Sequence, residues 1–150
     1  MNFSLFYLST NIDKFRYIVK YSNYCYNIFM KGGKSMKDSP LINKSKIFAL
    51  EVLKACKELR ATKCEGVLIN QFIRSGTSIG ANIREAFYAH SKADFVSKLQ
   101  IALKECYETE YWIKLLIDGG YYNNKEIQDK CIEIKKMLIA SINTAKENTK

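Results

Sequence analysis

Residues 71–87, QFIRSGTSIGANIREAF, contain the pattern that decides the fold. At about 100° per residue, the apolar residues and two glycines of this region fall on one side of a helix. This apolar side consists of Ile69, Phe72, Ile73, Gly76, Ile79, Gly80, Ile83 and Phe87. Four polar residues, which we call the polar face, fall on the opposite side: Arg74, Ser78, Asn82 and Glu85. The pattern predicts a two-faced helix over residues 65–88.

The two glycines on the apolar side are unfavourable inside a helix, each costing roughly 1 kcal/mol relative to alanine. Such a cost is tolerated where a neighbouring helix must approach closely, so Gly76 and Gly80 favour a tight helix crossing. A kink or a helix restart at these glycines is the alternative.

The polar face has three possible roles. It could be a solvated surface with an Arg–Glu pairing of little energetic value. It could be a subunit interface, in which Asn and Arg side chains satisfy one another across symmetry-related helices. It could also be a ligand or nucleic-acid site. Composition alone favours the solvated surface.

Helical periodicity continues on both sides of this segment. Residues 44–60, 91–119 and 124–146 each repeat apolar side chains at intervals of three and four. Ser91 is a suitable N-cap with Asp94 at the capping-box position, and Gly119-Gly120 is a suitable stop. We therefore predict an all-α protein, an antiparallel up-down four-helix bundle, over residues 36–150.

Residues 1–35 differ in composition, being rich in Tyr, Phe and Asn without a clear period. They end in Lys31-Gly-Gly-Lys-Ser35, whose codons can form a purine-rich run resembling a ribosome-binding site just before Met36. We expect Met36 to be the natural start and residues 1–35 to be a translated leader. A flexible N-terminal extension is the alternative.

The net charge indicates which kinds of partner the chain could contact. The formal net charge of +9 suggests contact with nucleic acid or, less often, with an acidic membrane surface. Five basic residues and one acidic residue place +4 of that charge in residues 1–35, which leaves +5 for residues 36–150.

No apolar run is long enough for a transmembrane helix, and no signal peptide is recognisable. Five cysteines without a C-x-x-C pair predict reduced thiols in a cytoplasmic protein.

The sequence gives no support for an enzyme. The only histidine, His90, falls at the predicted turn between the second and third helices, and we recognise no Ser/His/Asp or Cys/His set around it. The Glu-x-x-His pattern of metal-binding bundles is absent. Glu105, Glu108 and Asp94 could be imagined as an acid/base pair, but surface solvation explains them better. We expect no catalytic residues, no metal and no cofactor.

The stretch RSGTSIGANIREA (74–86), followed by SKADF (91–95), KLQIALKE (98–105) and ETEYWIKLL (108–116), resembles a bacterial four-helix-bundle family. This family includes proteins encoded in intervening sequences of the 23S rRNA gene and accessory variability determinants of diversity-generating retroelements. The sequence of residues 80–85, GANIRE, is more similar to the ribosomal branch than to the retroelement branch. The resemblance covers residues 44–122 well. It implies a ring-like homopentamer, and for the retroelement branch a basic scaffold that binds nucleic acid and a reverse transcriptase.

Two functions follow as hypotheses. The first is an oligomeric scaffold that binds RNA through its summed basic surface. Its candidate phosphate contacts are Lys54, Lys57, Arg60, Arg84, Lys92, Lys98, Lys135 and Lys136. The alternative is a protein-interaction module without a nucleic-acid role, whose contacts would be lined by Tyr88, Tyr111, Trp112, Tyr121 and Tyr122. In both, we expect the polar face to have an assembly or structural role.

Overall fold

Four long helices form the body of the computed structural model, which describes residues 13, 16–18, 20, 24–30 and 39–147. Their bounds are α2 Pro40–Leu59, α3 Gly66–Ala86, α4 Lys92–Asp118 and α5 Glu126–Glu147. The described residues contain no strand. The predicted all-α class is therefore confirmed.

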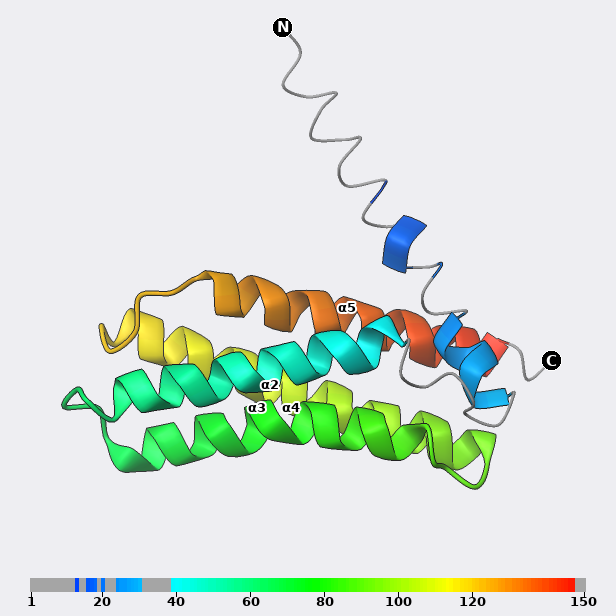
Figure 1. Cartoon of the computed structure of the whole chain (residues 1–150), viewed down its shortest axis with the longest axis horizontal. Coiled ribbons are helices and arrows are strands. Elements are labelled where there is room, and N and C mark those ends of the chain that lie inside the picture. Colours follow the sequence, from blue (N-terminus) through cyan, green and yellow to red (C-terminus); the bar gives the residue numbers. More distant parts are fainter. Residues whose placement is uncertain (1–12, 14–15, 19, 21–23, 31–38, 148–150) are drawn as a thin grey trace, which may run out of the picture.

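The helices lie side by side and alternate in direction along the chain (Figure 1). Contacts join α2 to α3, α3 to α4 and α4 to α5, and the ring is closed by contacts between α5 and α2. The connections between successive helices, at residues 60–65, 87–91 and 119–125, are short. Short connections place each helix beside the next one in the chain and in the opposite direction. This is the arrangement of an up-down bundle.

The predicted helix bounds agree with the structure to within four residues. The largest difference is at α2, which begins at Pro40 and not at Lys44. Proline fits the first turn of a helix, since its missing N–H would have no intrahelical partner there. The extra turn adds Leu41 to the core, where it is fully buried.

The core contains one apolar stripe from each helix. Phe48, Phe72 and Phe95 are its largest fully buried side chains, and Ile134 represents α5. Ser75, which the sequence pattern did not assign to the apolar side, is also buried, and its hydroxyl donates to the carbonyl of Gln71 at 3.0 Å. Burial of the serine is therefore compatible with its polarity.

Both predicted ends of α4 are confirmed. The backbone N–H of Asp94 donates to the Ser91 hydroxyl at 3.1 Å, as an N-cap requires. At the other end, Gly120 has a φ of 74°, a left-handed conformation that favours glycine.

The expected tight crossing lies between α2 and α3 at Gly76. A Cβ atom at Gly76 would lie 2.9 Å from both Cγ atoms of Val52, so only glycine fits there without a shift. Gly80 differs, because a Cβ there would lie 3.6 Å from the backbone oxygen of Ser45, an ordinary contact. Both glycines thus lie against α2, but only at Gly76 does the packing exclude a larger residue.

Residues 24–30 are helical and pack against the end of the bundle where α4 begins and α5 ends (Figure 1). Cys25 and Ile28 are buried, and the ring of Phe29 stacks on Phe95 with 4.3 Å between centroids. Met36 and most of residues 1–35 lie outside the described residues. The division of the chain at residue 36 stays a prediction.

Candidate functional site

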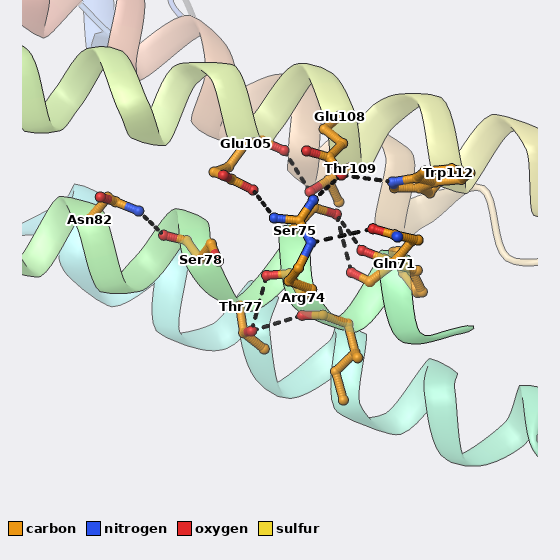
Figure 2. A network of polar contacts seen from close by, with 12 residues as sticks. Gln71, Arg74, Ser75, Thr77, Ser78, Asn82, Glu105, Glu108, Thr109 and Trp112 are labelled. Carbon is orange, nitrogen blue, oxygen red and sulfur yellow. Dashed lines mark hydrogen bonds and ion pairs between the residues drawn. The ribbon is translucent and has the colours of Figure 1, made fainter. Parts of the chain in front are cut away.

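The polar face of α3 lies beside α4 (Figure 2). Arg74 forms the most extensive contacts on it. Its Nη2 atom pairs with the Glu108 carboxylate, its Nη1 atom lies 3.7 Å from Oε2 of Glu105, and its Nε donates to Gln71 at 3.3 Å. The guanidinium therefore joins α3 to two carboxylates of α4.

Glu108 is held on two sides. Besides its pairing with Arg74, its Oε1 atom accepts a hydrogen bond from the indole Nε1 of Trp112 at 3.2 Å. The hydrogen bond from Arg74 is the main cause that lowers the pKa of Glu108. The carboxylate is consequently ionised near neutral pH and acts as an ion-pair partner. This arrangement does not resemble a general acid, whose carboxyl must keep its proton.

Glu105 has an incompletely satisfied carboxylate. Its Oε2 atom is buried and accepts no hydrogen bond from the described residues. The 3.7 Å separation from Arg74 is an ion-pair distance but is too long for a hydrogen bond. Arg74 is therefore the ion-pair partner of a carboxylate whose side chain is only 16% exposed.

The other three residues of the polar face make separate contacts. The amide of Asn82 donates to the Ser78 carbonyl at 2.9 Å, a bond within α3. Glu85 accepts from Lys98 of α4 at 2.6 Å. Arg74 and Glu85 thus pair with α4 and not with each other, which differs from the simple Arg–Glu pairing considered for a solvated surface.

The candidate cations of α2 lie on its outer side. Lys54, Lys57 and Arg60 are all exposed, and so is Lys46, a little over two helical turns before Lys54. None of these four forms an ion pair with another described residue. We call Lys46, Lys54, Lys57 and Arg60 the α2 basic stripe. Its charges are available to a partner, because no carboxylate within the described ranges neutralises them directly.

The candidates near the α3–α4 turn are in mixed environments. Arg84 is exposed. Lys98 is paired with Glu85, and this bond is the main cause that raises the pKa of Lys98. The ammonium of Lys92 lies 5.1 Å from the ring centroid of Tyr26. Among the three, Arg84 is the cation most available for a ligand.

The two adjacent candidates of α5 have different environments. Lys135 pairs with Glu110 of α4, and its ammonium lies 5.0 Å from the centroid of the Tyr107 ring. Its side chain is only 18% exposed. Lys136 is exposed. The two lysines were equal candidates in the sequence, but the structure shows Lys135 in contact with other side chains and Lys136 exposed to solvent.

The aromatic candidates divide in the same way. Tyr88, Tyr111 and Tyr121 are exposed. Trp112 and Tyr122 are partly buried and pack against the core.

Sequence reasoning did not identify the carboxylates that pair with Arg74, although Glu105 and Glu108 are three residues apart and therefore share a side of α4.

Comparison with known proteins gives the family. The family described as 23S rRNA-intervening sequence protein matches residues 37–140. The chain belongs to this family. The resemblance first seen in residues 74–116 is thereby confirmed. No curated protein matched the chain.

A solved structure supports the same family assignment. It is a protein of unknown function from the S23 ribosomal protein family of Bacteroides thetaiotaomicron, with 48% sequence identity and a TM-score of 0.66. The match covers 68% of this chain and 97% of that one. In the described part of the present chain, no helix is both long and apolar enough to span a membrane. Nor do three or more His, Cys, Asp or Glu residues group there in a way that could hold a metal ion.

Proposed function

We propose that the chain is a non-enzymatic oligomeric scaffold that binds RNA through exposed lysine and arginine side chains. The observation that carries this proposal is the α2 basic stripe. Three of its cations lie on the solvent-facing side of α2 and the fourth, Arg60, is the C-cap of that helix; all four are exposed and free of ion pairs among the described residues. Cations of this kind contact phosphates without reading sequence.

Oligomerisation would strengthen such binding. One chain presents few phosphate contacts, but several copies on one RNA act at a high effective concentration. The homopentamer implied by the family resemblance would repeat the stripe five times. The five free thiols support a reducing compartment, and we place the protein in the cytoplasm.

The test compares two triple variants of equal net charge. The first replaces Lys54, Lys57 and Arg60 by glutamine. The matched control replaces Lys104, Lys125 and Lys146 by glutamine; these lysines are also exposed and free of ion pairs among the described residues, but lie outside α2. Retention of unstructured RNA is measured over a series of salt concentrations, with light scattering to follow the oligomer. We expect strong loss only in the α2 variant, with a shallower salt dependence.

Two outcomes would contradict this proposal. Equal loss in both variants would indicate that only total charge matters. Absence of RNA retention by the unmodified protein, even at low salt, would favour the protein-interaction module. One observation supports that module: Tyr107, Tyr111 and Leu115 lie four residues apart along α4 and are 53%, 58% and 39% exposed.

A further inference from the structure

An open pocket lies at the turn between α3 and α4, apart from the α2 basic stripe. Its volume is about 570 Å³, within the range of small-molecule sites. Six of its lining residues have side chains able to interact with a polar or aromatic ligand: Arg84, Glu85, Tyr88, His90, Asp94 and Lys98. The pocket therefore combines an aromatic ring with both donors and acceptors.

Most of the charged groups in the pocket already have partners. Lys98 bonds to Glu85 at 2.6 Å, and Asp94 accepts from the backbone N–H of His90 at 3.3 Å. Two groups differ. Arg84 is exposed and forms no ion pair with a described residue, and the ring of Tyr88 is 65% exposed and therefore open to a ligand. A ligand could reach both, since Arg84 in the last turn of α3 and Tyr88 in the turn that follows α3 line the same pocket.

We infer that this pocket binds one unpaired nucleotide of RNA, with the base stacked on Tyr88 and the phosphate held by Arg84. This inference rests on the proposed function, because the nucleotide would belong to the RNA that the scaffold holds. Stacking on an aromatic side chain and a cation for the phosphate are the two elements that single-strand binding requires.

The charge balance of the pocket favours a nucleotide over a simple anion. Arg84 and Lys98 are matched by Glu85 and Asp94, so a free phosphate would gain little net attraction. A nucleobase presents donors and acceptors on its edges, and the carboxylates and the ammonium in the pocket can bond to both. The same carboxylates disfavour an acidic peptide.

The single histidine provides a direct reporter. His90 lines the pocket and is the only histidine in the chain, so its imidazole signal needs no assignment in protein made without a histidine tag. We would label histidine with ¹³C at Cε1 and titrate the full chain with nucleoside 5′-monophosphates. Inorganic phosphate and oligoglutamate serve as control ligands. We expect the nucleotides to shift the His90 signal and the two controls to leave it unchanged.

Two variants of the exposed ring decide whether stacking is responsible. Tyr88→Ala removes the ring and should weaken nucleotide binding about tenfold or more. Tyr88→Phe keeps the ring and should bind like the unmodified protein. Because Tyr88 is exposed, both variants should fold, which circular dichroism would verify. Full affinity in Tyr88→Ala, or an equal response to inorganic phosphate or oligoglutamate, would overturn the inference.

Failure of the inference can be distinguished from failure of the proposed function. RNA retention that depends on Lys54, Lys57 and Arg60, without any response of His90 to nucleotides, would overturn only the pocket assignment. A His90 response without RNA retention would overturn the scaffold and assign the pocket to free nucleotides. Absence of both would overturn both.

Discussion

Gly76 of α3 lies against Val52 of α2 so closely that a Cβ atom on the glycine would lie 2.9 Å from both Cγ atoms of the valine. Both methyl groups are at the same short distance, so rotation of the valine side chain cannot relieve the contact. Val52 is fully buried, which prevents it from moving outward. The missing side chain of Gly76 therefore allows α2 and α3 to approach closely at this point of their crossing.

We predict that Gly76→Ala and Gly80→Ala have opposite effects on stability. At Gly76 the overpacking of Val52, about 1–3 kcal/mol, should exceed the gain of roughly 1 kcal/mol in helix propensity. At Gly80 the added methyl group meets Ser45 only at ordinary contact distances. The gain in propensity should therefore remain. Urea unfolding followed by circular dichroism would measure both changes.

A double-mutant cycle provides the control. Val52→Ala removes the two methyl groups that the new Cβ would meet, so Gly76→Ala should be far less destabilising in that background. Equal costs in the two backgrounds would show that the contact with Val52 is not the cause.

The contact between Arg74 and Glu108 predicts a dependence of stability on pH. Because the pKa of Glu108 is lowered in the folded state, folding is favoured while this carboxylate is ionised. The contribution is present above the unfolded pKa of about 4.3 and is lost as the pH falls through the lower folded pKa. Glu108→Gln should reduce the difference between urea midpoints at about pH 7 and about pH 3. Glu126→Gln, at an exposed acidic residue, is the control. An unchanged difference in Glu108→Gln would contradict the assignment.

The sequence was sufficient for the fold because each helix buries a continuous apolar stripe. Phe48, Phe72 and Phe95 all occur at positions that helical periodicity assigns to the interior. Both ends of α4 could also be predicted, since Ser91 and Gly119-Gly120 act through local backbone chemistry. The start of α2 was predicted four residues late, at Lys44, because the apolar repeat that begins at Phe48 does not mark the first turn after Pro40.

The side-chain contacts between helices could not be predicted from the sequence in the same way. The polar face was recognisable as a set, but its partners depend on how α4 is rotated about its axis. Arg74 could not be connected to Glu105 and Glu108 without that information. For the same reason, Gly76 and Gly80 looked equivalent in sequence although only Gly76 faces a bulky side chain.

Thiol reactivity should distinguish Cys64 from the other four cysteines. Cys25, Cys56, Cys106 and Cys131 are buried, whereas Cys64 is half-buried in the α2–α3 connection. Burial raises the pKa of Cys56 to about 11, so little thiolate forms at neutral pH. We expect a disulfide reagent to modify one thiol readily in the native protein and all five after unfolding. Cys64→Ser should remove the ready phase, and persistence of that phase would contradict the assigned burial.

Asn82 tests the assembly role of the polar face. Its amide bonds only within α3 among the described residues and is half-buried, so the side chain is not required to hold α4. We predict that Asn82→Leu weakens oligomerisation more than it lowers helicity. Light scattering and circular dichroism would measure the two quantities. Equal loss of both would indicate a folding role instead.

The neighbouring lysines of α5 provide the sharpest test of which cations contact RNA. Lys136 is exposed, so Lys136→Gln should lower RNA affinity and reduce the salt slope by about 0.7 for each phosphate contact removed from a single strand. Lys135 is paired with Glu110 and shielded by Tyr107. Lys135→Gln should therefore leave RNA binding unchanged and destabilise the fold by up to about 1 kcal/mol. The two variants have equal net charge and adjacent positions, so a long-range effect of charge would change RNA binding equally in both. A weaker affinity in Lys135→Gln than in Lys136→Gln would show that the ion pair with Glu110 opens when RNA binds.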